Sequence, residues 1–503
     1  MPPALFLRKP SERPDPETAG EPRLQRALSP LTLTSLGLGG IIGTGIFVMI
    51  GIAAHDKTGP ALALSFLVAA IACAAVALCY AEFAASVPEA GSAYSYAYAT
   101  LGELPAWLIG WNLIFAYGIG AASVAQGWSH YFQDFLGGLG LTLPRALAST
   151  PYDLAPQMGK LVPTGSLGDL PALLITEVIS FCILRGMRAS LRFNFAMLSL
   201  KLAILFFVIG VGAFYIKPQN WHPFAPYGLL AQAGPGGQPL GMMAGAALVF
   251  YAYLGFEALS AYTEECRKPQ RDVPLGILAS VALCTLLYIA VAVVLTGIVP
   301  YDRINVRAPI SDAFGQVGLP WAQFLIALGA LTGITSVLLV ILLTLPRILM
   351  VMGRDGLLPP GVFSAIHPRY RTPWKATIVI GVAAGLLSAL VPLRILADLV
   401  MMATLLGYVV ICIAVLILRR THAHTTRRFR APLGPFVPLL GILTCLLLIR
   451  SLPSSAWLQL FAWLLLGLGV YFAYGRRHSV LARSHPATEP VGGLAAAEEG
   501  ALR

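Results

Sequence analysis

Charged residues are scarce in this sequence. Only 11% of its 503 residues are Asp, Glu, Lys or Arg, against about 25% in soluble globular proteins. The hydrophobic residues, counted as Ala, Val, Ile, Leu, Met, Phe, Trp, Tyr and Cys, make up 57%, and the mean hydropathy is +0.76. A soluble fold with so few charges would leave most of its surface apolar. The composition therefore argues against a soluble protein and indicates one that is embedded in a membrane.

The sequence also lacks the patterns of metal, disulfide and catalytic sites. None of its 7 cysteines forms a CxxC pair or has a histidine at zinc-ligand spacing, which favours small buried hydrophobic residues. HExxH and GxSxG are absent, and no apolar run contains a cluster of His, Asp and Glu. We therefore expect no metal site, no cofactor and no enzymatic activity.

Both ends of the chain are polar. The first thirty residues are basic and rich in proline before any apolar stretch begins, whereas a cleavable signal peptide would place its apolar region earlier. Residues 476–503 end in a stretch rich in Gly, Ala and Glu. We expect residues 1–30 and 476–503 to be cytosolic tails.

Between these tails, twelve apolar runs are long enough to cross a bilayer, whose core needs about 20 mostly apolar residues per helix. The runs cover about residues 32–54, 59–85, 103–137, 169–187, 193–216, 240–266, 273–299, 318–352, 373–392, 394–418, 433–451 and 455–475. The third and the eighth are long enough to be tilted or to extend beyond the lipid. The sequence thus predicts an all-α integral membrane protein with twelve transmembrane helices.

Lys and Arg are divided unevenly between the two sets of loops. With the N-terminus inside, 25 of the 34 Lys and Arg residues fall in cytosolic segments and 8 in outer loops. Cytoplasmic loops carry an excess of Lys and Arg, so both termini are predicted to be cytosolic. The formal net charge of +11 is then explained by cytosolic helix ends that can contact anionic lipids, and no nucleic-acid partner is expected.

The first span contains an unusual run of glycines. Residues 36–47 read LGLGGIIGTGIF, and a glycine in a helix interior costs about 1 kcal/mol relative to alanine. Gly43, Thr44 and Gly45 at the middle of the span therefore indicate an interrupted helix. The alternative is a small-residue face for close helix packing. Gly39 and Gly43 fit that spacing, but Gly45 does not extend it.

The sixth span carries a carboxylate at its centre. Residues 250–258 read FYAYLGFEA, and a charged side chain there costs roughly 2.5–3.5 kcal/mol or more. We therefore expect Glu257 to face the protein interior and to have a partner. Gly255 beside it indicates a second interrupted helix.

The two interrupted spans lie five helices apart. Because five is odd, a second copy of the unit enters the membrane from the opposite side, which predicts inverted repeats at 31–216 and 217–420, followed by two helices at 421–475. Interrupted helices at matching positions indicate a binding site near the bilayer midplane. Their freed N–H groups suit a carboxylate and their freed carbonyls an ammonium, so the pair suits a zwitterion.

Four stretches carry a resemblance to a known transporter family. They are GIIGTGIF at 40–47, YAEFAASVPEAGSAYSYAYATLGE at 80–103, YAYLGFEALSAYTEECRKPQRDVPLGI at 251–277 and PRILMVMGRDGLLP at 346–359. Over residues from about 30 to 475 the chain resembles the amino acid–polyamine–organocation transporters, and within them bacterial proteins similar to cationic amino acid transporters. The resemblance implies a leucine-transporter-type fold in a bacterial inner membrane, with a 5+5 inverted repeat and broken helices 1 and 6.

The resemblance also implies which groups bind the substrate. The backbone amides of Gly43, Thr44 and Gly45 would bind its carboxylate. The backbone carbonyls near Ile41 and around Phe250 and Tyr253 would bind its amino group. Phe250 matches the family's aromatic gate over the substrate. Without the resemblance, ordinary aromatic packing would explain Phe250 and Tyr253. Glu257 is the acid that we assign to the substrate site.

Lys201 is the only Lys or Arg that falls well inside a predicted span. It lies about eight residues into the fifth span, or roughly 12 Å at 1.5 Å per residue. Its side chain either snorkels to the inner interface or is a buried amine that gains and loses a proton. In related transporters a lysine at the matching position of RFNFAMLSLKLAILFF (192–207) takes the place of a sodium ion. The resemblance implies that Lys201 braces the unwound first helix and the eighth helix near 332–336, and couples transport to protons.

The remaining acids are less informative. Glu264 and Glu265 precede a basic run that contains Arg271, and a cytosolic gate competes with an ordinary solvated helix end as the explanation. Glu177 lies in the fourth span, and we find no partner or role for it. Relatives often carry a glutamate just before the tyrosine of the third span, whereas this chain has Ala116 before Tyr117. We therefore favour a small or medium neutral L-amino acid as substrate over a cationic one.

Together these observations predict a secondary active transporter that imports amino acids by alternating access, with proton coupling through Lys201. An exchanger or antiporter, a sodium-coupled symporter and an amino-acid-sensing receptor on the same scaffold are the alternatives. A channel would need polar rings along a pore rather than two isolated breaks.

Overall fold

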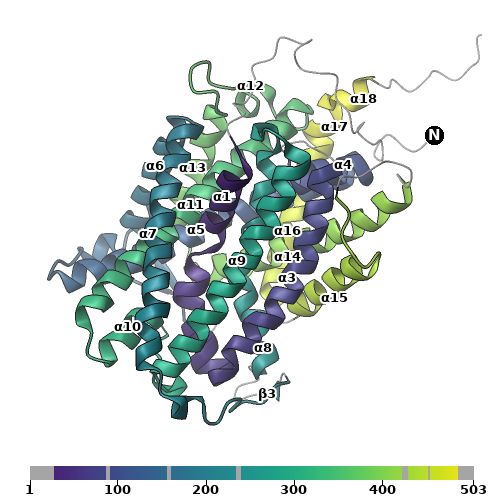
Figure 1. The fold of residues 1–503 in the computed structure, drawn as a ribbon. Coiled ribbons are helices and arrows are strands. Elements are labelled where there is room, and N and C mark those ends of the chain that lie inside the picture. Colours follow the sequence, from purple (N-terminus) through teal and green to yellow (C-terminus); the bar gives the residue numbers. More distant parts are fainter. Residues whose placement is uncertain are drawn as a thin grey trace, which may run out of the picture.

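The computed structural model describes residues 28–86, 91–155, 160–230, 232–233, 239–306, 308–421, 429–450 and 454–484. Within them the chain is a bundle of long helices (Figure 1). Most of the expected N-terminal tail, and the C-terminal tail beyond residue 484, lie outside the described residues.

Helices occupy the first five predicted spans. They are α1 (Pro30–Ile41), continued by the π-helical turns η3 (Gly45–Met49) and η4 (Ala54–Thr58) around α2 (Ile50–Ala53), then α3 (Leu62–Ser86), α5 (Glu103–Gly138), α6 (Leu170–Leu184) and α7 (Met187–Gly212).

The next five spans are also helical. They are α8 (Met242–Val249) with the 3₁₀ segments η10 (Phe250–Tyr253) and η11 (Phe256–Glu265), then α9 (Pro269–Ile298), α11 (Pro320–Arg354), α13 (Trp374–Leu390) and α14 (Leu393–Thr421). The last two spans are α15 (Phe436–Arg450) and α16 (Ser454–Val470), and α16 is extended by η13 (Tyr471–Gly475).

Eight helical segments of the described chain are long and apolar enough to cross a membrane. Shorter apolar helices of 12 to 17 residues, namely α1, α6, α13 and α15, occupy other predicted spans. The protein is therefore an all-helical, multi-span membrane protein, as predicted. The full number of crossings stays a prediction.

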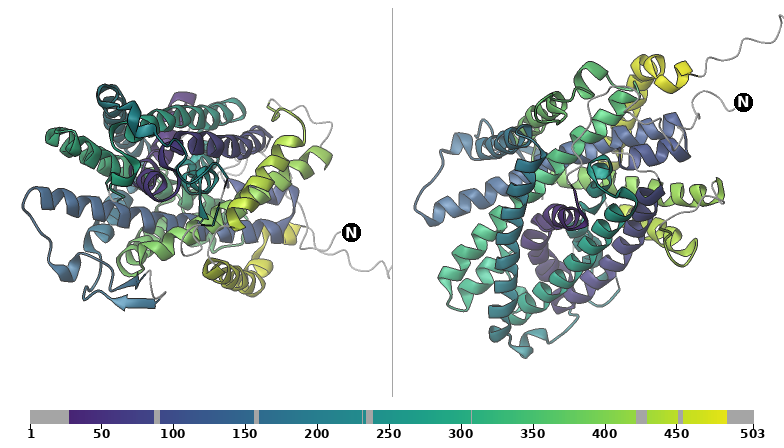
Figure 2. Two further views of the ribbon diagram at one scale, coloured as in Figure 1. Left: turned by 90° about the horizontal axis from the view of Figure 1, so that it is seen from below. Right: turned by 45° about the horizontal axis from the view of Figure 1, so that its top comes forward.

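The structure adds elements that the sequence did not predict. Two short helices, α4 (Ala93–Thr100) and α10 (Pro309–Gln316), lie in loops, and α12 (Pro360–Phe363), α17 (Arg476–His478) and α18 (Val480–Ser484) lie together at one end of the molecule (Figure 1). The antiparallel hairpin of β1 (Tyr152–Ala155) and β2 (Lys160–Pro163) extends from the edge of the bundle (Figure 2). A second small hairpin pairs β3 (Gln232–Ala233) with β4 (Pro239–Leu240).

Local chemistry explains where α1 begins and ends. Ser29 caps its start: the Ser29 hydroxyl accepts the Thr32 amide at 3.3 Å, and the Thr32 hydroxyl accepts the Ser29 amide at 2.7 Å. Pro30 then occupies the first helical position, where its missing N–H costs nothing. The helix ends at Ile41 because Ile42 is extended, with ψ 101°. The first span is therefore interrupted within the predicted glycine run.

The sixth span is interrupted as well. Leu254 is extended, and Gly255 has φ 114°, a left-handed conformation that a side chain would disfavour. A Cβ on Gly255 would also lie 2.7 Å from the Gly40 carbonyl oxygen, and a Cβ on Gly45 would overlap the backbone of Ala252. The two breaks therefore pack backbone against backbone, which only residues without side chains permit.

This packing predicts that Gly45→Ala is strongly disruptive. Its methyl group meets the Ala252 backbone, which cannot rotate away as a side chain could, and overpacking costs about 1–3 kcal/mol. We expect a lower melting temperature for the purified protein, followed by tryptophan fluorescence. Gly118→Ala in α5 is the matched control, since its nearest neighbour is a Leu345 methyl carbon at 3.9 Å. Equal melting temperatures for the two variants would contradict the proposed contact.

Candidate functional site

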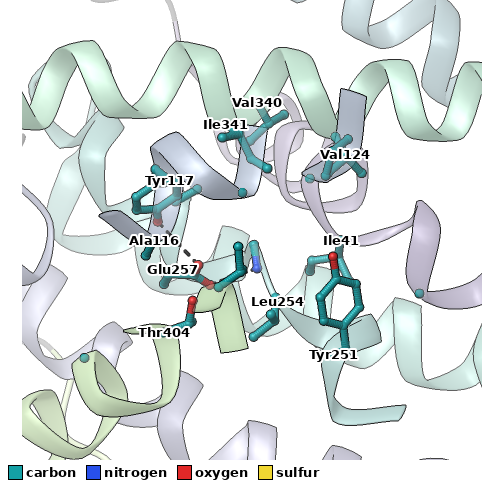
Figure 3. Close-up of a pocket in the computed structure, with 18 of the residues that line it drawn as sticks. Ile41, Ala116, Tyr117, Val124, Tyr251, Leu254, Glu257, Val340, Ile341 and Thr404 are labelled. Atoms are coloured by element: carbon teal, nitrogen blue, oxygen red, sulfur yellow. Dashed lines mark hydrogen bonds between the residues drawn. The ribbon is translucent and has the colours of Figure 1, made fainter. Parts of the chain in front are cut away.

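A cavity of about 70 Å³ lies between the two breaks, within the helix bundle. The first break contributes Ile41, Thr44 and Gly45 to its lining, and the second contributes Leu254 and Gly255. Figure 3 shows Ile41 and Tyr251 on one side of the cavity and Tyr117, Glu257 and Thr404 on the other. Of the seven residues that we predicted to bind substrate, Ile41, Thr44, Gly45 and Glu257 line this cavity.

The cavity wall is largely apolar. Aliphatic and small side chains come from α5, α11 and α14, at Leu113, Ala116, Val124, Val337, Ile341 and Val400. At Ala116, where the resemblance implies that relatives often carry a glutamate, the wall presents a methyl group, and the carboxylate among the described lining residues is that of Glu257. An apolar wall with a few polar groups is the usual character of a small-molecule site.

The first break is held by Lys201 of α7. Its side chain is fully buried, and Nζ donates to the carbonyl oxygens of Gly39 at 3.0 Å and Ile42 at 2.7 Å. It also donates to the Ser336 hydroxyl of α11 at 2.6 Å. An ammonium carries three donors, and these oxygens accept all three. The side chain therefore does not snorkel, and it braces the two helices that the resemblance implied.

Tyr288 of α9 joins the two breaks. Its buried hydroxyl lies 3.0 Å from the carbonyl oxygen of Ile41 and 3.0 Å from that of Ala252. A phenol has a single hydrogen to donate, so it serves one carbonyl at a time. The Ile41 carbonyl, which we expected to take the substrate's amino group, is thus already shared with Tyr288 in this conformation.

Glu257 lies immediately after the second break and is 6% exposed. One carboxylate oxygen accepts the Gly255 amide at 2.9 Å and the Tyr408 hydroxyl at 2.7 Å, and the other accepts the Tyr117 hydroxyl at 3.4 Å. The acid therefore faces the interior and has partners, as predicted, and they are neutral donors. Carboxylates hydrogen-bonded in this way can be buried at lower cost than bare charges.

The other predicted residues of the breaks lie behind the cavity wall. Gly43 packs against the Val337 side chain, and the Tyr253 hydroxyl donates to the Phe66 carbonyl at 3.1 Å. Phe250 is 1% exposed, and its ring lies 6.4 Å from that of Tyr408, edge to face. Neither Phe250 nor Tyr253 lines the cavity, whereas Tyr251, which lies between them in the sequence, does. The aromatic gate assigned to Phe250 stays a prediction.

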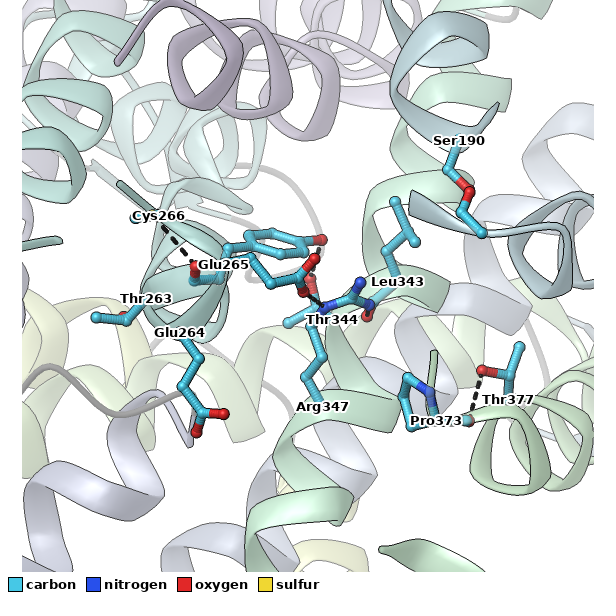
Figure 4. Close-up of polar contacts among 12 residues, drawn as sticks. Ser190, Thr263, Glu264, Glu265, Cys266, Leu343, Thr344, Arg347, Pro373 and Thr377 are labelled. Carbon is cyan, nitrogen blue, oxygen red and sulfur yellow. Dashed lines mark hydrogen bonds and ion pairs between the residues drawn. The ribbon is translucent and has the colours of Figure 1, made fainter. Parts of the chain in front are cut away.

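Two ion pairs join η11 to α11. The side chain of Glu265 in η11 pairs with Arg347 of α11, and that of Glu264 pairs with Arg354 at 2.9 Å. Figure 4 shows Arg347 reaching Glu265 while Glu264 points the other way. The partners are therefore arginines of α11, not the basic run after η11 that we considered. Arg271 of that run is exposed.

The residues just before α1 are bonded to the end of η11. The Leu28 amide donates to the Glu265 carbonyl at 3.0 Å, and the Arg267 amide donates to the Leu28 carbonyl at 3.2 Å. The segment before the first break is thus tied to the end of the segment after the second break.

Comparison with known proteins decides the family. The family model described as "Amino acid permease" matches residues 28–473, which contain both breaks and the cavity. The chain belongs to the amino acid permease family. The resemblance to amino acid–polyamine–organocation transporters is thus confirmed, and this permease is a transporter, not an enzyme.

Three relatives indicate the range within the family. The permease is 44% identical over 478 residues to the methylthioribose transporter of Bacillus subtilis (strain 168), covering 95% of this chain and 99% of the relative. It is 43% identical over 465 residues to the branched-chain amino acid permease BcaP of the same organism, covering 92% and 96%. It is 39% identical over 400 residues to the vacuolar cationic amino acid transporter 4 of Arabidopsis thaliana, covering 80% and 64%.

Several residues of the permease's site were missed in the sequence. Tyr288 and Tyr408 gave no signal, because tyrosines in apolar spans usually pack as ordinary core residues. Arg347 and Arg354 lie in the motif at 346–359, and their position at the end of a span was the available clue. Glu177, by contrast, is half-buried on α6 beside Gly385 of α13, away from the cavity.

These contacts predict that Glu257→Gln weakens the site. The glutamine amide offers one acceptor oxygen in place of two, so one of the three donors loses its acceptor or must reorient to accept from the amide nitrogen, at a cost of about 1–3 kcal/mol. We expect a lower melting temperature and loss of the stabilisation that a bound amino acid gives. Glu177→Gln removes the same charge at mid-span outside the cavity and should leave both properties unchanged. Similar behaviour of the two variants would argue against a role for Glu257 in the site.

Proposed function

We propose that this permease imports amino acids across the bacterial cytoplasmic membrane by alternating access. The proposal includes twelve crossings, two inverted five-helix repeats and cytosolic termini. The observation that carries it is the cavity between two interrupted helices, because such breaks expose backbone groups at membrane depth only where they serve a buried site. The ion pairs of η11 and α11 then form the inner gate, closed in this conformation.

The two breaks supply complementary ends for a zwitterion. Thr44 and Gly45 line the cavity where the helix restarts, and amides at a helix start favour a carboxylate. Gly43 directly precedes them but lies behind the cavity wall in this conformation, so its amide would join the proposed carboxylate site only if the break shifts. The carbonyls of Ile41 and Ala252 lie within hydrogen-bond reach of the same hydroxyl, that of Tyr288. We propose that the substrate's ammonium approaches these carbonyls and takes over one of them from Tyr288.

The apolar wall of the cavity indicates which substrate side chains it accepts. Ala116, Val124, Ile341 and Val400 offer no charge to a basic substrate. The carboxylate of Glu257, which also lines the cavity, already accepts hydrogen bonds from three neutral donors, and burying an unpaired ammonium is costly. We propose branched-chain and other medium neutral L-amino acids as substrates, in keeping with the 43% identity to a branched-chain amino acid permease. The first test is a thermal-shift screen of the purified protein against twenty amino acids and methylthioribose, because ligands stabilise the state that they bind.

Methylthioribose is included in that screen because one relative is a methylthioribose transporter and because the cavity contains polar groups that suit it. Glu257, Tyr251 and Thr404 line the cavity with oxygen atoms that could bind the hydroxyl groups of a thiosugar. Stabilisation by isoleucine, leucine or valine supports the amino-acid assignment. Stabilisation by methylthioribose alone would replace it with a thiosugar transporter on the same fold.

Lys201 is the proposed coupling residue. Its ammonium occupies a position ringed by oxygens, as a metal cation would. A neutral amine has two donors instead of three, so loss of the proton removes one of the three hydrogen bonds that Lys201 donates. Deprotonation would therefore loosen the hold of α7 on the first break and on α11. Sodium symport and amino-acid exchange are the alternative modes, and a receptor on this scaffold would bind without transport.

The substrate assignment predicts the effect of Ala116→Glu. The new carboxylate would lie in the cavity wall and favour a cationic side chain over a neutral one. We expect the thermal shift with lysine or arginine to rise and the shift with isoleucine to fall. Ala116→Gln, which adds the same bulk without charge, should weaken isoleucine binding without creating lysine binding. Unchanged selectivity in Ala116→Glu would count against this wall as the side-chain site.

The coupling assignment predicts the effect of Lys201→Met. Methionine fills similar space but cannot change its charge. In proteoliposomes, wild-type uptake of radiolabelled isoleucine should rise when the outside is made more acidic than the lumen, and the variant should lose this dependence. Counterflow in the absence of a gradient serves as the control for a folded, binding-competent variant. Normal uptake with unchanged pH dependence, or a requirement for sodium, would refute proton coupling through Lys201.

A further inference from the structure

A second cavity lies at the end of the molecule that holds α12, α17 and α18 (Figure 1). Its volume is about 490 Å³, which is within the usual range of about 300–1,000 Å³ for ligand pockets. The end of α11 forms one wall and the C-terminal helices form the other. It shares no lining residue with the substrate cavity.

Basic groups line this cavity. Arg354, His478 and Arg483 contribute to its walls, and none of its described lining residues is Asp or Glu. The exposed Arg476 and Arg477 are neighbours on the same C-terminal segment and add to the positive potential. Anions are therefore attracted to this place.

Three acids lie near this cavity, and each is already engaged. Glu103 accepts the hydroxyl group of Ser479, which lies between two of the lining residues. Glu264 binds the Nη1 atom of Arg354, at 2.9 and 3.2 Å to its two oxygens. Asp355 accepts the Tyr94 hydroxyl at 2.8 Å. In the described part of the chain, the recorded hydrogen bonds of the Arg354 guanidinium come from Nη1, so its other nitrogens can serve a second anion.

The remaining lining suits an organic group next to that anion. The rings of Tyr474 and His478 are stacked 4.1 Å apart, and with Ile366 and Val480 they give the basic cavity an apolar side. The planar fork of arginine matches the oxygens of phosphate in geometry and charge. We propose that this cavity binds a phosphate ester, with its phosphate between Arg354 and Arg483.

Two sources supply such a group at this end of the molecule. One is the headgroup of an anionic phospholipid, and the other is a soluble phosphate ester. The positively charged helix ends place the cavity on the proposed cytosolic side, where both occur.

Occupancy of this cavity is linked to the gate through Arg354. The partner of Arg354, Glu264, belongs to η11, which begins directly after the second break and ends at the closed gate. A bound phosphate and the Glu264 carboxylate compete for one guanidinium and repel each other. By reciprocity, a change that removes the Glu264 charge strengthens phosphate binding, and a bound phosphate weakens the gate pair.

Isothermal titration of the purified full-length protein tests the site directly, independently of any transport assay. The probes are glycerol 3-phosphate and short-chain dihexanoyl phosphatidylglycerol, with the zwitterionic dihexanoyl phosphatidylcholine as control. We expect at least one anionic probe to bind, and roughly tenfold weaker binding in the Arg354→Gln/Arg483→Gln double variant. Arg369→Gln removes an exposed charge outside the cavity and should bind as the wild type does. Glu264→Gln should bind several-fold more tightly.

The outcomes separate the sources of the ligand. Binding of glycerol 3-phosphate identifies a site for soluble esters, and binding of phosphatidylglycerol alone identifies a headgroup site. If neither anionic probe binds, if phosphatidylcholine binds equally well, or if the double variant binds as the wild type does, the proposal is overturned. Should the double variant not purify as a single species, Arg483→Gln alone decides, since the recorded contact of that side chain is with the Arg477 carbonyl at the surface.

Discussion

The need to satisfy backbone oxygens where two helices are interrupted organises this protein. In the membrane interior each unpaired carbonyl costs several kcal/mol. Here side chains supply the donors. Lys201 donates to the carbonyl oxygens of Gly39 and Ile42. The Tyr288 hydroxyl lies within hydrogen-bond distance of the carbonyl oxygens of Ile41 and Ala252. Ser336 adds a second donor to Gly39. The breaks therefore exist because three other helices, α7, α9 and α11, supply donors at matching depth.

The same arrangement makes the breaks responsive. Tyr288 has one hydrogen for two carbonyls, and Lys201 has three only while it is protonated. In the proposed mechanism, a bound substrate ammonium or the loss of the Lys201 proton would change the hydrogen bonds of these oxygens, at the place where α1 and the sixth span meet backbone to backbone. Because Gly45 and Gly255 leave no side chain between the segments, a shift of one break must displace the other. Binding and helix movement are linked by contact, without an intervening relay.

The sequence predicted the environment of a residue correctly where few environments in a membrane are energetically acceptable for it. A glycine run in an apolar span, or a lone lysine within one, is so costly in a plain lipid-facing helix that its environment can be anticipated, as for Gly43 to Gly45 and Lys201. It failed where partners are distant along the chain: Arg347 lies 82 residues from Glu265, whereas Arg271 is six positions away and exposed. The short helices α4 and α10 were missed because a helix of eight residues is stabilised by its packing more than by its own sequence.

The distribution of ion pairs bears on how the proposed inner gate would open. In the described chain, the Arg–carboxylate pairs are Arg347–Glu265, Arg354–Glu264 and Arg419–Glu82, and all three involve residues at or near the helix ends that we assign to the cytosol. Removing one partner of a buried pair costs about 3–5 kcal/mol because a charge is left uncompensated. Opening the inner gate avoids that cost only if water reaches Arg347 and Glu265 as they separate. The pair of Arg354 and Glu264, with side chains 17% and 25% accessible, is more exposed than the pair of Arg347 and Glu265, at 1% and 2%, so water reaches it first. Separation of the gate is therefore expected to begin at this outer pair and to proceed towards the buried one.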